Sequence, residues 1–341
     1  LIKSQVCLFE GTWEKYHEGT VFGVSQSTPD KYLNLAAEAA LDLINSGVYS
    51  LYTTGDPKED FKVMFQQMGY SNHVEVMFWE KYSRDLGKKH FILRDANGWN
   101  RGLGVTKSLV DDFLCSDGLP TAVSSLYQGD NTLTDVLANR DPRLDATVFG
   151  PGDPFEVTPY PTGDTTWVFE KSFLDRPANN QCSTGYQLEK GYRPDPIALE
   201  GFYNGETGRV KFRFAEALLN YAEAKAELGS INQSDIDLSI NKLRDRVGLP
   251  HLDINNITND PNWLFPDLSP IINEVRRERR VELVCEGEGH RLFDMLRWRA
   301  HKLLVGKRPL GAKFDQSMYP SLVIGESVLL NDEGYVDPYK N

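Results

Sequence analysis

The chain has 341 residues, and its 37 Lys and Arg against 49 Asp and Glu give a formal net charge of −12 at pH 7. A protein this acidic is a poor binder of nucleic acids, because that binding depends on neutralising phosphates with basic side chains. Hydrophobic residues make up 40% of the chain, which excludes wholesale disorder, and no apolar run approaches the roughly 20 residues of a membrane-spanning helix.

The chain opens with a predicted helix over residues 1–16. Val6, Phe9 and Trp13 recur at helical spacing, and no capping residue stands at the start. We therefore expect that sequence belonging upstream is missing from this chain. The lack of a targeting segment then says nothing about the compartment.

A second helix is predicted over residues 30–46. It begins after Thr28 with Pro29 in its first turn, carries one apolar stripe, and ends at Gly47. The stripe consists of Leu33, Ala36, Ala37, Ala40, Leu41 and Ile44. Two helices joined by a short loop form an αα-hairpin.

Residues 48–211 are predicted to be mixed in structure. Segments 74–79 and 167–169 read as short strands. Gly, Pro, Asn and Asp accumulate in the remainder, which indicates long loops. These loops cover residues 94–104, 150–166 and 175–209.

A second helical hairpin is predicted over residues 212–247. Its first helix ends at Gly229, and Ser234 with Asp237 resembles a capping box for its second helix. The hairpin has the size of a tetratricopeptide-type unit, although the full motif is absent. Such units bury their apolar faces against one another, so a lone one is not expected to be stable.

The third helical region, residues 268–304, is dense in charge, and residues 305–341 read as loop. Glu278 and Glu282 lie on a row that is apolar at both ends, whereas a solvated face would account for Arg276 and Arg280. Partly buried carboxylates need partners, and arginines suit them. A structural ion-pair network is the preferred interpretation, and a catalytic carboxylate pair is the alternative.

Cysteine and histidine spacing predicts no metal site and no cofactor. Cys7, Cys115, Cys182 and Cys285 form no C-x-x-C pair, and the six histidines are scattered. We expect reduced thiols, with Cys7 and Cys285 buried in helices, and a single disulfide as the alternative. No nucleotide-binding, metalloprotease or serine-hydrolase motif is present.

The charged helical region carries a specific resemblance. Residues 276–283 (RRERRVEL), 286–294 (EGEGHRLFD) and 297–298 (RW) closely resemble the C-terminal signature of the SusD/RagB family. Further segments resemble the family in the same order. They are 9–17, 109–118, 139–144, 212–224 and 244–250. Two departures are the repeated Glu-Gly at 286–289 and the lack of a counterpart to the family's N-terminal part with its lipidated cysteine.

The resemblance implies a mainly α fold, with tetratricopeptide-like hairpins on one side and a large, loop-rich region with a few short strands that presents the ligand site. Residues 1–72 would be the end of the N-terminal helical part and 73–341 the C-terminal region, packed with it as one body. The family comprises non-catalytic outer-membrane lipoproteins of Bacteroidetes that capture oligosaccharides for a SusC-like TonB-dependent transporter. Contact with the membrane would run only through a lipid anchor absent from this chain.

Other functions remain open beside this one. The same architecture could bind a peptide or another nutrient. An all-α glycoside hydrolase would need two carboxylates at a set separation, which the 49 acidic residues do not specify. A tetratricopeptide-type scaffold would need hairpins throughout, and the long, non-repetitive stretch of residues 48–211 argues against it.

Sugar binding directs attention to aromatic residues on loops, because flat rings cover the apolar faces of sugars and nearby polar side chains pair with their hydroxyls. The candidate ligand-binding residues are Trp99 with Asn100 and Arg101, Tyr70 with Asn72, Trp167, and Tyr203. Each aromatic could instead anchor its loop on the core. Trp298, Phe293 and Trp13 are expected in the helical core.

Overall fold

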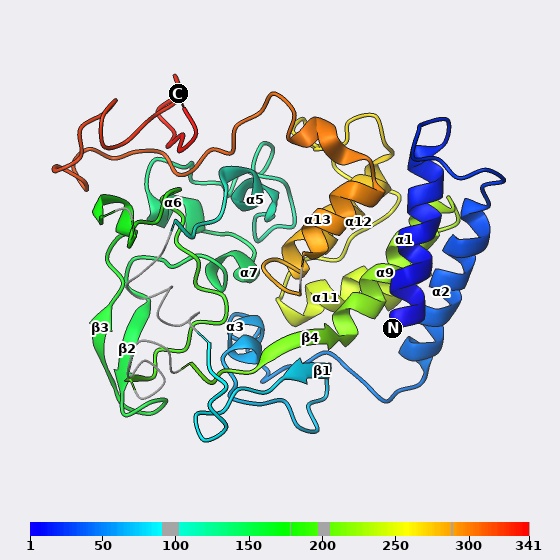
Figure 1. Cartoon of the computed structure of the whole chain (residues 1–341), viewed down its shortest axis with the longest axis horizontal. Coiled ribbons are helices and arrows are strands. Elements are labelled where there is room, and N and C mark those ends of the chain that lie inside the picture. The colour runs from blue at the N-terminus through cyan, green and yellow to red at the C-terminus, as the bar shows by residue number, and fades with distance from the viewer. Residues whose placement is uncertain (91–101, 178, 197–204, 288, 341) are drawn as a thin grey trace.

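The longer helices gather at one end of the molecule, and short helices, a hairpin and irregular chain lie at the other, as Figure 1 shows for the computed structural model. The structure describes residues 1–90, 102–177, 179–196, 205–287 and 289–340. The predicted mainly α class with a few short strands is confirmed. The helices are α1 (Ile2–His17), α2 (Pro29–Asn45), α3 (Asp60–Phe65), α5 (Lys107–Asp112), α6 (Leu133–Leu137), α7 (Pro142–Asp145), α9 (Phe214–Glu227), α10 (Gln233–Leu238), α11 (Ile240–Arg246), α12 (Pro270–Glu282), α13 (His290–Arg297), and the 3-10 turns η1 (Phe173–Asp175) and η2 (Ala300–Leu303). The strands are β1 (Val76–Glu80), β2 (Pro154–Thr158), β3 (Asp164–Val168) and β4 (Arg209–Arg213).

The first predicted hairpin forms as α1 and α2. Pro29 occupies the first turn of α2, and Gly47 just beyond the helix adopts a left-handed φ of +65°. The predicted stripe of α2 is buried apart from the partly buried Leu41, and it packs between α1 and α9. A Cβ added to Gly11 of α1 would lie 2.8 Å from Leu33 Cγ, so the absence of a side chain lets the two helices approach closely.

The second predicted hairpin forms with different details. Residues 209–213 are a strand, β4, which pairs antiparallel with β1 and leads directly into α9. The capping box uses Asn232 and Asp235 in place of the predicted Ser234 and Asp237. The second helix is broken at Ser239 into α10 and α11. Because the polar cap begins two residues earlier, α10 starts at Gln233.

The third predicted helical region, residues 268–304, consists of two helices, α12 and α13, followed by the short turn η2. A turn separates α12 from α13, with left-handed φ values of +55° at Cys285, +65° at Gly287 and +108° at Gly289. The repeated Glu-Gly supplies the glycines that this turn requires. Cys285 is therefore exposed on a turn, and not buried in a helix as expected, while Cys7 is only partly buried. All four cysteines are free.

The loop-rich end contains one hairpin that the sequence did not predict in full. Strand β3 covers the expected strand at 167–169 except for its last residue, but β2 and the first half of β3 fall within a predicted loop, 150–166. The two strands pair antiparallel from Pro154 with Val168 to Thr158 with Asp164. No helix among the described residues has the length and apolar character needed to cross a membrane.

Candidate functional site

The outer surface of the β2–β3 hairpin presents a flat aromatic ring. All five residues of β3 are exposed, and Trp167 is 43% exposed. Its ring meets Phe155 of β2 edge to face, with 4.6 Å between ring centroids and 78° between planes. The indole thus contacts a buried ring and remains 43% exposed to solvent.

A buried aromatic cluster supports this hairpin from below. Phe155, which is fully buried, packs on Tyr192 at 5.2 Å and on Phe169 at 5.8 Å between centroids. The Tyr192 hydroxyl donates a 2.7 Å hydrogen bond to the Phe155 carbonyl. Trp167 therefore contacts a ring that is itself packed in a buried aromatic cluster.

Polar side chains accompany the ring on the same hairpin and beside it. Thr166 donates to Glu156 across the strands at 2.8 Å. Tyr160 lies in the connection between the two strands. The guanidinium of Arg193, from a later segment, stacks on its ring at 4.2 Å from the ring centroid. Arg193 also donates to the Gln66 carbonyl at 3.1 Å and pairs with Asp195 at 3.3 Å. Donors and acceptors are thus available for hydroxyl groups.

Only some of the predicted ligand-binding residues lie in the described part of the chain. Trp99, Asn100, Arg101 and Tyr203 lie outside the described residues. Trp167 is described and is 43% exposed, and its role in ligand binding stays a prediction.

The predicted pair of Tyr70 and Asn72 is divided between core and surface. Tyr70 is only 2% exposed and donates a 2.8 Å hydrogen bond to the Met64 carbonyl. A ring enclosed in this way cannot stack on a ligand, so Tyr70 is the loop anchor that was the alternative. Asn72 is exposed in a turn with φ +59°.

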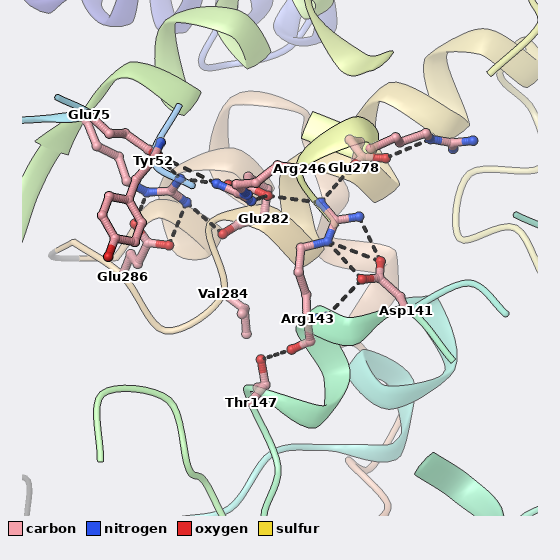
Figure 2. Close-up of polar contacts among 12 residues, drawn as sticks. Tyr52, Glu75, Asp141, Arg143, Thr147, Arg246, Glu278, Glu282, Val284 and Glu286 are labelled. Atoms are coloured by element: carbon pink, nitrogen blue, oxygen red, sulfur yellow. Dashed lines mark hydrogen bonds and ion pairs between the residues drawn. The ribbon is translucent and has the colours of Figure 1, made fainter. Parts of the chain in front are cut away.

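A second polar cluster, at the centre of the molecule, has the residue types of a catalytic site. Figure 2 shows Glu282 of α12 among arginines from three other elements. Its carboxylate lies 2.9 Å from Arg143 of α7, 2.6 Å from Arg213 of β4 and 2.7 Å from Arg246 of α11. None of these four side chains is more than slightly exposed. We call them the central ion-pair cluster.

Neighbouring charges extend the central ion-pair cluster. Arg143 also pairs with Glu278 at 2.5 Å and with Asp141 at 2.7 Å. Arg213 also pairs with Glu75 at 2.9 Å and Glu286 at 2.6 Å. Every carboxylate in this group is thus paired with at least one guanidinium, which a buried charge requires.

This cluster stabilises the fold and does not suit acid–base catalysis. Burial alone would raise the pKa of Glu282, but Arg246, Arg213 and Arg143 outweigh burial and hold the pKa well below its ordinary value. A glycosidase acid needs the opposite shift, so that the group stays protonated near neutral pH. The predicted structural network is therefore confirmed for Glu278 and Glu282.

Arg276 corrects the expectation of a solvated face on α12. It is buried, pairs with Glu227 of α9 at 3.0 Å, and stacks between Phe265 and Trp298 at 4.4 and 4.2 Å from their centroids. Arginine tolerates this position because its planar cation stacks on aromatic faces while it pairs with a carboxylate. The charge pattern of α12 could not predict these two rings, because Phe265 and Trp298 lie outside this helix in the sequence.

The expectations for the helical aromatics are met in part. Trp298 is buried, and its indole N–H donates to Glu223 at 2.7 Å. Trp13 is only partly buried. Phe293 is 51% exposed, so its predicted core position is wrong. The turn before α13 orients that helix so that Asp294 and Arg297 face inward, and Phe293 faces outward.

Among the residues that the structure describes, no group of three or more His, Cys, Asp or Glu side chains could hold a metal ion. The described part of the chain thus offers two polar assemblies of different kinds. The central ion-pair cluster is buried, and each of its four side chains has at least one ion-pair partner. The β2–β3 surface is open, aromatic and polar at its edge.

Comparison with known proteins gives a family and a set of similar folds. The family model of the SusD family matches residues 61–337. A SusD-like protein from Bacteroides fragilis NCTC 9343 superposes with a TM-score of 0.64 at 21% identity, over 98% of this chain and 57% of that one. A SusD-like carbohydrate binding protein from the same organism superposes with a TM-score of 0.61 at 19% identity, over 98% and 57%. The chain thus spans little more than half the length of either structure, and no curated protein sequence matches it.

Proposed function

The chain belongs to the SusD family, and we propose that it captures oligosaccharides without chemically altering them. The observation that carries this proposal is the exposed Trp167 ring, seated on the buried Phe155 and flanked by polar side chains of the same hairpin. An aromatic face covers the C–H face of a sugar ring, and side-chain donors and acceptors pair with its hydroxyls. One similar structure is described as a carbohydrate binding protein, which agrees with this chemistry.

The proposal extends to the setting of the protein. The chain would act at the surface of the outer membrane and deliver its ligand to a SusC-like TonB-dependent transporter. Residues 1–72 would be the end of an N-terminal helical part and residues 73–341 the C-terminal region, packed as one body. The packing of α2 between α1 and α9 supports one body, because it joins the two parts through buried apolar side chains.

The test compares binding by the wild-type chain and the Trp167→Ala variant in isothermal titration against a panel of plant, host and microbial oligosaccharides. Loss of one stacking ring should weaken the affinity about tenfold or more, since tenfold corresponds to about 1.4 kcal/mol. The matched control is Phe293→Ala, which removes another half-exposed aromatic ring from α13. It should leave the affinity unchanged. Equal affinities for Trp167→Ala and the wild type would remove the hairpin from the site.

The predicted residues outside the described part belong to the same proposal. Trp99, Asn100, Arg101 and Tyr203 are tested by alanine substitution in the same titration, with Asn72 as the exposed polar candidate. A ligand-binding role requires weaker affinity with an unchanged circular dichroism spectrum. Tyr70→Phe serves as a negative control, because the buried ring loses only its hydrogen bond to Met64.

The same purified protein can be used to test the two alternative functions, glycoside hydrolysis and peptide binding. Incubation with the oligosaccharides that bind, followed by an assay for new reducing ends, detects a glycoside hydrolase. Peptide capture would appear as saturable binding of peptides by a protein that binds no sugar in the panel. The full pairing of Glu278 and Glu282 with arginines disfavours the hydrolase, since neither carboxylate is free to act as an acid.

A further inference from the structure

A groove beside Arg280 of α12 contains cationic side chains that belong neither to the central ion-pair cluster nor to the β2–β3 surface. It lies between α5, α13 and the segment after η2, which runs above α5 in the view of Figure 1. The backbone N–H of Lys107 donates to the Leu310 carbonyl at 2.8 Å, which fastens that segment to α5. The cavity has a volume of about 480 Å³, within the range of about 300–1,000 Å³ that is usual for small-molecule sites.

Five cations and one carboxylate line this groove. The cations are Lys107, Arg280, Arg291, Lys307 and Arg308, and the carboxylate is Asp111. Three of the cations already have partners. Lys107 pairs with Asp111 at 2.9 Å, Arg280 pairs with Asp112, and Arg308 pairs with Asp337 at 2.8 Å.

Arg291 and Lys307 are different. Within the described part of the chain, neither side chain has a hydrogen bond or an ion-pair partner; the Arg291 guanidinium lies near the Trp298 ring, 5.9 Å from its centre. Arg291 is only partly exposed. Burial, together with the neighbouring charge of Arg280, lowers the pKa of Arg291 to about 10. Keeping a partly buried guanidinium charged without an anionic partner costs free energy, and an anion bound in the groove would offset that cost.

The remaining walls of the groove are apolar. They are formed by Leu264, Met295, Leu303, Leu304, Pro309 and Leu310. No aromatic side chain is among the lining residues of this cavity, so the groove lacks the flat ring that a sugar face requires. Aliphatic walls beside an unpaired arginine suit a ligand that combines an apolar body with an anionic group.

We propose that this groove binds a small amphiphilic ligand whose apolar body lies against the leucines and whose carboxylate or phosphate pairs with Arg291. Charge complementarity carries the choice of ligand, since cations outnumber carboxylates in the lining although the whole chain carries a net charge of −12. Lys307, exposed on the same segment as Pro309 and Leu310, adds a second cation that has no partner among the described residues. The site is separate from the β2–β3 hairpin and does not rest on the proposed glycan function.

The test uses octanoate and octyl phosphate as probes in isothermal titration with the whole chain, and 1-octanol as the uncharged probe of the same length. Saturable binding of either anionic probe, at least about tenfold tighter than that of 1-octanol, is expected, and the tighter of the two identifies the preferred head group. Binding of neither anionic probe, or equal binding of 1-octanol, would overturn the proposal.

Matched variants locate the anionic group. Arg291→Gln should weaken the bound anionic probe about tenfold, and Arg291→Lys should restore part of the affinity because it restores the charge. Arg299→Gln is the control, since Arg299 is exposed just after α13 and outside the groove. Circular dichroism confirms that each variant is folded. An Arg291→Gln affinity equal to that of the wild type, or an equal loss in Arg299→Gln, would contradict the assignment.

Discussion

Replacing Glu282 by Gln should destabilise the protein more than almost any other single change of one charge. The substitution keeps the size of the side chain but removes the charge that pairs with Arg143, Arg213 and Arg246 at 2.9, 2.6 and 2.7 Å. Three buried guanidinium groups then face a neutral amide. Arg143 and Arg213 keep other carboxylate partners, whereas Arg246 keeps, among the described residues, only Glu75, at 3.6 Å. Loss of one partner of a buried ion pair costs about 3–5 kcal/mol where the opposite charge is left uncompensated, which applies here mainly to Arg246. That loss is a large part of the roughly 5–15 kcal/mol that stabilises a typical domain.

Urea-induced unfolding at pH 7, followed by circular dichroism, measures the free energy of unfolding of the two proteins. Glu326→Gln is the matched control, because Glu326 is exposed, and it should change the free energy by less than about 0.5 kcal/mol. A loss below about 1 kcal/mol for Glu282→Gln would refute the reasoning. It would mean that the three arginines gain adequate solvation or other partners once the charge is gone.

The contribution of Glu282 to the free energy of unfolding should depend on pH, and the direction of this dependence can be predicted. The pKa of Glu282 is well below its ordinary value in the folded protein, whereas the unfolded chain has a pKa of about 4.3. The unfolded state therefore binds the proton first as the pH falls. The stabilisation is fully present above about pH 4.3 and is lost as the pH falls from there toward the folded pKa. The difference in unfolding free energy between wild type and Glu282→Gln should be constant between about pH 5.5 and 7.5 and shrink below about pH 4.3.

Two further substitutions test the helical half, each by urea-induced unfolding. Gly11→Val places a Cβ 2.8 Å from Leu33 Cγ and should cost about 1–3 kcal/mol by forcing α1 away from α2; a loss below about 0.5 kcal/mol would show that this contact relaxes freely. Phe293→Ser removes a ring that is 51% exposed and should change the free energy by less than about 1 kcal/mol. A loss near the roughly 3–5 kcal/mol typical of a buried Phe would restore the original prediction that Phe293 lies in the core.

Periodicity in the sequence predicted those elements whose apolar stripe meets another helix. The stripe of α2 from Leu33 to Ile44 packs against α1 and α9, and α9 is buried along nearly its whole length. Helical spacing alone determines which side chains share a face, so such elements need no knowledge of distant contacts. The ion-pair network also followed from local spacing, because two glutamates stood on an otherwise apolar row.

Predictions failed where the conformation of a single turn decides the direction of the next helix. The spacing of Phe293 is the same whether the chain is one helix or two. The left-handed residues at 285, 287 and 289 break the helix and turn the ring outward. The partners of Arg276 illustrate a second limit. Phe265 and Glu227 reach it from other parts of the chain, and no local pattern announces such contacts.

The sequence also could not show which candidate aromatic residues anchor a loop on the core and which are exposed for binding. Both kinds are flanked by similar residue types in the sequence. Tyr70 and Trp167 both lie in segments rich in polar residues, yet one ring is 2% exposed and the other 43%. The difference is produced by long-range packing. Tyr70 packs against Trp79, whereas the ring contact of Trp167 within the described part of the chain is with Phe155. Burial therefore adds the information that decides between the two roles.

The most charged segment of the chain and its proposed binding surface therefore do different work, and the two can be separated experimentally. Glu282 joins α12 to residues of α7, β4 and α11, so its loss should lower the unfolding free energy while the remaining folded molecules bind ligand with the affinity of the wild type. Trp167 lies at the surface and is 43% exposed, so its loss should change affinity and leave stability nearly unchanged. Titration and unfolding performed on both variants test this directly. If Glu282→Gln weakened binding at temperatures where it is fully folded, the ion-pair cluster would have to position the binding surface as well as stabilise the fold.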